Sequence, residues 1–401
     1  MNRDFRYRLD KAGNFIKFKN GKPIKPGGTG IYPVYGSNGI IGMSDEYREE
    51  YSVIIGRVGA YCGSVQFCRG RYWASDNTIV ASPKDNDTDV VFLYYVLKNA
   101  NLNRWSGGAA QPLMTQTVIK EIELPHPDIS IQQKIASILS AYDDLIENNT
   151  RRIQILEEMA QLIYREWFVN FRFPGYEKVR FVNSELGKIP EGWKVVQLGE
   201  VLESIESGSR PKGGIDSSER EVPSIGAENV LGLGRYDFNK EKYVSREFYE
   251  NMRKGKVQSG DVLLYKDGAK IGRKSMFRDG FPHEVCCINE HVFILRTNSR
   301  CSQNYLYFYL DRPDITQKII NLNTNAAQPG INQAGVKSLP ILLPPKELIE
   351  LFDNKVEPLL GLLFNLAKKN QTLRKKRDLL LPKLISGEID VSNLEIIVKE
   401  F

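Results

Sequence analysis

The sequence predicts an α+β protein with two similar strand-rich domains and two long antiparallel α-helices that form a coiled-coil rod. The first observation is a repeat: Ala109-Ala110-Gln111-Pro112 returns as Ala326-Ala327-Gln328-Pro329. The second is that each copy precedes a long segment with apolar residues at helical spacing, 129–172 and 346–401. A repeat of this length indicates two whole domains, because solenoid repeats run only about 20–50 residues.

The repeat extends beyond these short segments. Residues 53–63 are similar to residues 262–272, and residues 92–97 are similar to residues 305–310. Two similar but divergent domains suit a target that has two similar but different parts.

The composition is typical of a folded protein with a mild basic bias. The chain has 401 residues, 41% of them hydrophobic, and a formal net charge of +6. Such a charge permits an anionic partner but does not require one. No apolar run reaches the roughly 18–20 residues that span a bilayer, and no secretory signal follows the charged N-terminus. We therefore expect a cytoplasmic protein that does not enter a membrane.

The cysteines predict neither disulfides nor a metal site. There are five, an odd number, and none forms a C-x-x-C motif. His283, Cys286, Cys287 and His291 are metal-ligand residue types. However, adjacent cysteines on a strand point to opposite faces, so the favoured alternative is a strand, Val285 to Phe293, with buried thiols.

The first domain, residues 1–128, has the pattern of strands and turns. Glycine-rich turn clusters flank an extended run, and β-branched residues predict further strands. The predicted elements are strands at 31–35, 53–55 and 78–80 and a short helix at 92–98.

The first helical region, residues 129–172, begins with Ser130 and Gln133 at capping-box spacing. Its apolar residues follow a heptad pattern with a polar residue, Asn149, in the middle. One predicted seam position takes Ile135, Tyr142, Asn149, Leu156 and Ile163, and another takes Ile131, Ile138, Leu145, Arg152 and Met159. Leu139, Ile146 and Ile153 widen this stripe.

A connector and the second domain occupy residues 173–345, and the second helical region occupies residues 346–401. Pro358 is expected to kink this helix. One seam takes Ile349, Val356, Leu363, Asn370, Arg377 and Leu384, and the other takes Phe352, Leu359, Leu366, Leu373 and Leu380.

The two helices have matching length, phase and polar layer, with Asn149 in register with Asn370. This match favours an antiparallel pair. The domains would then lie at opposite ends of the rod, with approximate two-fold symmetry. The alternative is two separate surface helices, each packed on its own domain.

Catalytic motifs are missing from the sequence. There is no phosphate-binding G-x-x-x-x-G-K-[ST], no G-x-G-x-x-G and no G-x-S-x-G motif. Only three histidines could act as bases near neutral pH. The chain also lacks the Asn-Pro-Pro-aromatic motif of amino-methyltransferases and a convincing nuclease cluster.

Both domains instead contain basic, glycine-rich loops. Lysine and arginine can neutralise phosphates, and arginine, asparagine and serine can read base edges in the major groove. Each loop alone could be a plain solvated turn, but their recurrence in both copies favours nucleic-acid binding. The candidate DNA-binding residues are Lys22, Lys25, Ser37, Asn38, Arg57 and Tyr61 in the first domain, and Ser209, Arg210, Lys212, Lys266, Lys270 and Arg273 in the second.

Several further segments complete a family pattern that covers the whole chain. They are residues 33–42, the opening Trp193 to Glu200, the helix pieces Met159-Ala160, Tyr164 and 167–171, and the C-terminal run 381–389. With these segments the chain resembles the specificity subunit of type I restriction–modification systems. The first domain departs from the pattern, since it lacks the Trp…Leu-Gly-Glu opening of the second.

The resemblance implies a non-catalytic subunit that binds double-stranded DNA. Each domain would read one half of a split, asymmetric site, and the helices would set the spacing and dock two modification methyltransferase subunits. S-adenosylmethionine, ATP and Mg would be bound by those subunits and by a restriction subunit, with no cofactor or metal in this chain. The alternatives are a DNA methyltransferase or nuclease with degenerate motifs, and a protein scaffold that does not contact DNA.

Overall fold

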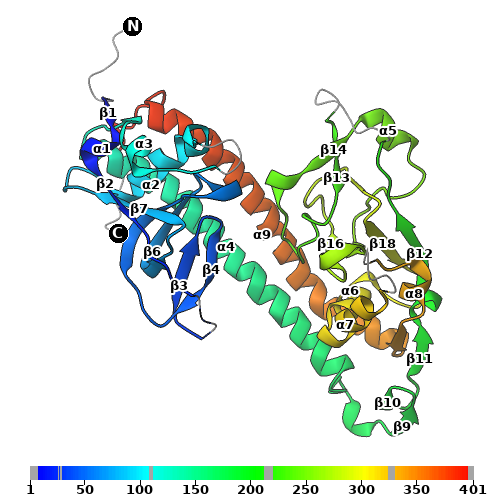
Figure 1. The fold of residues 1–401 in the computed structure, drawn as a ribbon. Coiled ribbons are helices and arrows are strands. Elements are labelled where there is room, and N and C mark those ends of the chain that lie inside the picture. Colours follow the sequence, from blue (N-terminus) through cyan, green and yellow to red (C-terminus); the bar gives the residue numbers. More distant parts are fainter. Residues whose placement is uncertain are drawn as a thin grey trace. The chain divides into compact units, whose positions relative to one another are not determined.

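The computed structural model describes residues 8–25, 27, 29–107, 112–211, 220–323 and 330–395 (Figure 1). The chain forms two compact units. Unit 1 comprises Met1–Ile146 and Thr372–Phe401, and unit 2 comprises Glu147–Gln371. The fold is of mixed α and β type with two long helices, as the sequence predicts. Among the described residues, no helix combines the length and the apolar character needed to cross a membrane.

Unit 1 is built around a six-stranded sheet. Its neighbouring strands are antiparallel, except for one parallel pair, β3 and β6. In sheet order the strands are β2 (Ile16–Asn20), β7 (Thr78–Pro83), β5 (Glu49–Gly56), β6 (Val65–Ala74), β3 (Tyr32–Gly36) and β4 (Gly39–Ser44). The β-branched run Val53, Ile54 and Ile55 is fully buried in β5, because that strand lies inside the sheet and is covered on both faces.

Short elements complete unit 1. The predicted helix at 92–98 is α2 (Val90–Asn99), and it begins where the Asp89 side chain accepts a hydrogen bond from the Phe92 amide at 2.7 Å. The others are β1 (Leu9–Lys11) paired with β8 (Glu123–Pro125), α1 (Ala12–Phe15), α3 (Gln116–Lys120), and the 3₁₀ turns η1 (Gly59–Tyr61) and η2 (Leu102–Trp105).

Unit 2 contains a four-stranded sheet, a three-stranded sheet and two strand pairs. The first sheet has the order β12 (Leu202–Ser207), β18 (Val292–Thr297), β15 (Asp261–Tyr265) and β16 (Lys274–Phe277). The second has the order β14 (Lys242–Val244), β13 (Val222–Ile225) and β17 (Cys287–Ile288). The pairs are β9 (Phe181–Ser184) with β10 (Gly187–Pro190), and β11 (Lys194–Gln197) with β19 (Pro340–Leu343). The shorter helices are α5 (Arg246–Asn251), α6 (Gln303–Asp311), α7 (Pro313–Asn321) and α8 (Gln333–Lys337), with the 3₁₀ turns η3 (Tyr176–Lys178), η4 (Leu198–Glu200), η6 (Phe238–Lys240) and η7 (Gly268–Lys270).

The two predicted long helices are α4 (Ile129–Phe168) and α9 (Lys346–Ser386). Each contributes residues to both units. In unit 1, α4 and α9 share one core through Ile131, Ile135, Leu139, Leu381, Leu384 and Ile385. Inside unit 2 the pairing is antiparallel, since Asn149 contacts Asn370 while the later residue Tyr164 contacts the earlier residue Phe352.

The polar residues in the middle of the helices lie opposite each other. Asn149 Nδ2 donates a hydrogen bond to Asn370 Oδ1 at 2.9 Å, and Asn370 Nδ2 donates to Thr150 Oγ1 at 3.1 Å. Asn149 and Asn370 are both buried. Because buried amides need partners, this pair favours one register of the helices.

The predicted second seam of α4 is confirmed at Ile131 and Ile138, which belong to or pack against the core of unit 1, but it is wrong further along the helix. Leu145 and Met159 are 53% and 45% exposed, respectively. The buried companion positions are Leu139, Ile146, Ile153 and Ala160. The heptad pattern alone could not determine which of these positions are buried. Helix α4 packs on residues of the strands and loops as well as on α9, so its buried face is wider than a two-helix seam.

The helix start also differs from the capping-box prediction. Helix α4 begins at Ile129, so Ser130 lies inside the first turn. Gln132, and not Gln133, anchors the start: its buried amide donates to the carbonyl oxygens of Pro127 at 2.7 Å and Asp87 at 2.9 Å. Pro358 lies inside α9 without ending it.

The segment with His283, Cys286, Cys287 and His291 forms two short strands, and not the single predicted strand. Asn289 separates β17 from β18, because its buried side chain accepts a hydrogen bond from the His291 amide at 2.9 Å and turns the chain. Cys286 and Cys287 are buried in different clusters, as expected for adjacent residues on opposite faces. The described residues contain no group of three or more metal-ligand side chains arranged to hold an ion.

Candidate nucleic-acid interface

The glycine-rich loop after β5 in unit 1 is held by main-chain hydrogen bonds. The Arg57 amide donates to the Asn77 carbonyl at 2.9 Å, and the Arg57 carbonyl accepts from the Met114 amide at 2.8 Å. Met114 follows the repeated Ala-Ala-Gln-Pro segment, of which 109–111 lie outside the described residues. Two distant segments therefore meet at this loop.

The loop after β15 in unit 2 is held in the same way. The Lys266 amide donates to the His291 carbonyl at 3.0 Å, and the Lys266 carbonyl accepts from the Ile331 amide at 3.0 Å. Ile331 follows the second copy of the repeated segment, of which 326–329 lie outside the described residues. The same two contacts thus recur in both units, and we call this arrangement the loop frame.

A second loop joins each frame at a glycine. A Cβ on Gly21 would lie 1.9 Å from the Ser75 carbonyl oxygen, and one on Gly208 would lie 1.7 Å from the Ile288 carbonyl oxygen. Neither position could carry a side chain without moving the backbone. This close approach places the following residues, Lys22 in unit 1 and Ser209 with Arg210 in unit 2, beside the frame.

In unit 1 the frame brings Ser37 to Arg57. Ser37 Oγ donates to the Asn77 carbonyl at 2.8 Å and accepts from the Val58 amide at 3.3 Å. Asn38 is exposed at the adjacent position, and Tyr61 on η1 is 51% exposed. Polar and aromatic side chains are therefore available to a ligand.

In unit 2 the frame carries a cluster of five side chains in which basic and acidic residues alternate, and we call it the charged cluster. Arg210 Nε lies 2.8 Å from Glu290 Oε2, and Glu290 Oε1 lies 3.3 Å from His291 Nε2. His291 Nδ1 lies 2.7 Å from Asp267 Oδ2, which also accepts from Lys266 Nζ at 2.9 Å. These contacts restrict the rotamers of all five groups, so their polar atoms are ordered before a ligand binds.

The remaining candidate residues have different positions. Lys22 and Lys25 are both exposed, and Lys270 lies on η7. Lys212 lies outside the described residues. Arg273 is not in the charged cluster; it lines a cavity against α4.

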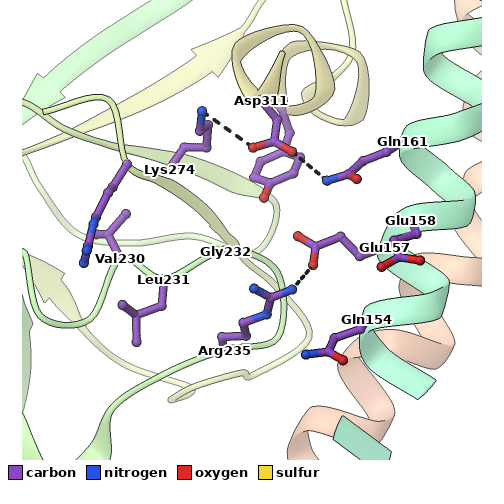
Figure 2. Close-up of a pocket in the computed structure, with 12 residues that line it drawn as sticks. Gln154, Glu157, Glu158, Gln161, Val230, Leu231, Gly232, Arg235, Lys274 and Asp311 are labelled. Carbon is purple, nitrogen blue, oxygen red and sulfur yellow. Dashed lines mark hydrogen bonds and ion pairs between the residues drawn. The ribbon is translucent and has the colours of Figure 1, made fainter. Parts of the chain in front are cut away.

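That cavity, of about 690 Å³, lies in unit 2 between α4 and the segments 230–235, 273–274 and 307–311 (Figure 2). Glu157 of α4 pairs with Arg235. Gln161 of α4 donates to Asp311 Oδ2 at 2.8 Å, and Lys274 Nζ lies 3.6 Å from Asp311 Oδ1. Opposite charges within the cavity thus compensate one another and attach α4 to the domain.

Burial dominates the ionisation of these groups. Desolvation raises the pKa of the Asp311 and Glu157 carboxyls and lowers the pKa of the Lys274 ammonium. The Lys274 charge opposes the shift of the Asp311 pKa, and the Arg235 charge opposes that of the Glu157 pKa. The carboxyls already have cationic partners, which suits structural pairs better than general acids or bases.

We expect Lys274→Met to destabilise unit 2, because the substitution leaves Asp311 without its cation. The free energy of unfolding should fall by about 2–3 kcal/mol at pH 7. The pKa of Asp311 should rise further. A carboxyl with a raised folded pKa contributes stability at low pH and loses it as pH rises through that pKa. The deficit should therefore shrink as pH falls from 7 toward the ordinary carboxyl range near pH 4.

Urea unfolding at several pH values measures this effect. Lys254→Met, which removes an exposed lysine, is the matched control and should change stability by less than about 0.5 kcal/mol. A deficit that grows toward low pH would contradict the assignment.

The candidate DNA-binding residues taken from the sequence omit four residues of the loop frames and the charged cluster: Asn77, Asp267, Glu290 and His291. The signal that could have found them is the repeat itself. Asp267 is in register with Val58, and the hydrogen bonds place His291 where Asn77 stands in unit 1.

Comparisons with known proteins agree with this repeat. A family model described as the type I restriction modification DNA specificity domain matches residues 11–158 and 190–350. The MjaIX specificity subunit of a type I restriction enzyme of Methanocaldococcus jannaschii is 29% identical over 78% of this chain and 72% of its own length. The MjaVIII specificity subunit of the same organism is 24% identical over 97% and 94%.

A solved structure shows the same fold. The S subunit of a type I restriction–modification system from M. genitalium has a TM-score of 0.59 and 17% sequence identity, covering 96% of this chain and 97% of its own.

Proposed function

The chain belongs to the type I restriction modification DNA specificity family, and from this premise we propose that its two units read the two halves of a bipartite DNA site. The observation that carries the proposal is the loop frame. It recurs in both units with the same main-chain contacts and with different side chains. The same main-chain arrangement with different side chains in the two units suits an asymmetric DNA site whose two halves differ.

The chain acts as a specificity subunit and not as an enzyme, in keeping with the relatives' names. In this proposal, residues 1–128 and 173–345 recognise DNA, and residues 129–172 and 346–401 link the domains and dock two methyltransferase subunits. Those subunits supply S-adenosylmethionine chemistry, and a restriction subunit uses ATP and Mg. We propose that the protein acts together with these subunits on DNA in the cytoplasm.

The charge of the loops supports a salt-dependent interaction. Each phosphate contact should add roughly 0.9 to the slope of log affinity against log salt. We expect Lys22→Gln, which removes an exposed cation beside the frame, to reduce that slope by about 0.9 for every duplex sequence. The measurement is a salt titration of duplex binding by the complex with its methyltransferase subunits. A slope near zero for the unsubstituted complex would favour the scaffold alternative.

Replacing one recognition domain tests whether each domain recognises its own half of the DNA site independently of the other. Residues 193–344 can be exchanged for the corresponding segment of a relative such as the MjaVIII specificity subunit. We expect one half of the methylated motif to change and the other half to persist, because the loop frame of unit 1 is untouched. The methylated bases are mapped by sequencing DNA from cells that carry the complete complex. Simultaneous change of both halves would contradict independent reading.

A further inference from the structure

We propose that Asn77 in unit 1 and the Asp267–His291 pair in unit 2 determine which base pairs the two units recognise. This inference rests on the proposed function and assigns its specificity to particular side chains. Its starting point is that the two frames share their main-chain contacts while their side chains differ.

The backbones of the two frames match closely. The distance from the Arg57 amide to the Asn77 carbonyl is 2.9 Å, and the distance from the Lys266 amide to the His291 carbonyl is 3.0 Å. On this common backbone, unit 1 presents an exposed amide at Asn77, and unit 2 presents an imidazole at His291. An acidic residue, Asp76 or Glu290, precedes each of them, so positions 77 and 291 differ while the residues before them are alike in charge.

The neighbouring loop position differs as well. Val58 of unit 1 is in register with Asp267 of unit 2. Val58 contributes its amide to the Ser37 hydroxyl at 3.3 Å, whereas Asp267 contributes a carboxylate that holds both His291 and Lys266. Unit 2 therefore has a charged acceptor where unit 1 has an apolar side chain.

The carboxylates in the charged cluster indicate that it contacts bases and does not only bind phosphates. A surface that only binds phosphates would gain from cations and lose from carboxylates, because a carboxylate repels a phosphate. Asp267 and Glu290 nevertheless lie between Arg210, Lys266 and His291. Carboxylates can accept from the N4 amino group of cytosine, and an aligned arginine can donate to both acceptors of guanine. The cluster thus presents donors and acceptors in a fixed order, as base-edge recognition requires.

In unit 1 the exposed Asn77 side chain suits adenine, and not the cytosine and guanine that suit unit 2. An exposed asparagine amide offers one donor and one acceptor side by side, the pair that matches N6 and N7 of adenine. The Asn77 carbonyl is occupied by the Arg57 amide and the Ser37 hydroxyl, which fixes the backbone beneath this side chain. We therefore assign an A·T pair to the Asn77 position and a C·G pair to the Asp267–His291 position.

In unit 1 a purely structural role does not explain the Asn77 side chain, whereas in unit 2 the Asp267–His291 contact orders the groups that we assign to recognition. The frame of unit 1 is closed by the main-chain groups of Arg57, Asn77 and Met114, so its loops are held whichever side chain stands at 77. In unit 1 the Ser37 hydroxyl completes the contact without using the Asn77 amide. The Asn77 side chain is thus available to a ligand.

The experiment transplants the unit 1 side chains into unit 2. The double variant Asp267→Val with His291→Asn, and the single variant Asn77→Ala, are made in the full-length chain in complex with its methyltransferase subunits. Methylated motifs are mapped in cells, and methylation rates are measured on duplexes that carry each base pair at each position. We expect each variant to lose about 10- to 100-fold discrimination at one position in its own half of the motif, with the other half unchanged.

Two controls separate the outcomes. Glu203→Val removes an exposed carboxylate from β12 and should leave the motif and the rates unchanged. Thermal unfolding of each complex reports a structural role. An unchanged motif with slower methylation of all sequences and a lower Tm would overturn the inference, and so would an unchanged motif at an unchanged rate. If the unsubstituted complex methylates no bipartite site, the proposed function itself fails.

Discussion

Two inserted residues in each long helix should abolish methylation, whereas four should preserve it and lengthen the spacer of the recognised site. The insertions are placed after Ile146 in α4 and after Gln371 in α9, at the borders of the compact units, so that contacts within each unit are kept. Two residues turn each helix by about 200°, whereas four turn it by about 400°, close to one full turn. Only the four-residue insertion lets the buried face of each helix continue on the same side.

The expected spacer change follows from helix geometry. Four residues add about 6 Å to a helix. Since one base pair spans about 3.4 Å, the spacer should grow by one or two base pairs if the helices set the spacing. The measurement is the methylated motif in cells, with both half-sites expected to keep their bases. Normal activity with the two-residue insertion, or an unchanged spacer with four, would show that the helices do not set the spacing.

Phe168→Ala should destabilise unit 2 by about 3–5 kcal/mol, because it opens a large cavity where several elements meet. Phe168, at the end of α4, is 2% exposed. Its ring lies 4.8 Å from Tyr305, 5.1 Å from Phe352 and 5.9 Å from Trp193, measured between centroids. Loss of this ring therefore weakens the contact of α4 with α6, with α9 and with the opening of the second domain at once.

Thermal unfolding measures the effect, with an expected fall in Tm of about 10 °C for a unit of this size. Phe181→Ala is the matched control: Phe181 is 46% exposed on β9 and also contacts an aromatic residue, Phe171. We expect the control to cost less than about 1 kcal/mol. A loss of less than about 1 kcal/mol for Phe168→Ala would mean that this ring does not stabilise unit 2.

Two residues of the family motifs lie in the hydrophobic core. Phe168 and Trp193 belong to segments that resemble the specificity subunits, and both are buried in the core of unit 2. These motif residues therefore act through packing. The residues that we assign to recognition, Asn77 and His291, lie outside the motifs. A family motif can in this way identify a fold while the specificity lies on the loops that the fold holds.

The sequence by itself determined the two-domain plan, the two long helices and the place of the loops. Repetition reveals duplicated domains, and a long apolar period reveals a helix, because both signals are carried by order along the chain alone. The equivalence of Arg57 and Lys266 was visible in this way. So was the match between Asn149 and Asn370, whose amides lie 2.9 Å apart.

Only the tertiary structure decided which faces are buried and which side chains meet. The heptad pattern placed Leu145 and Met159 in a seam, but both are exposed, because α4 packs on strands and loops as well as on α9 and its buried face follows Leu139, Ile146 and Ile153. The charged cluster joins Arg210, Asp267 and His291 from three loops far apart in the chain. Such contacts depend on how distant backbones approach, which local propensity and periodicity do not encode.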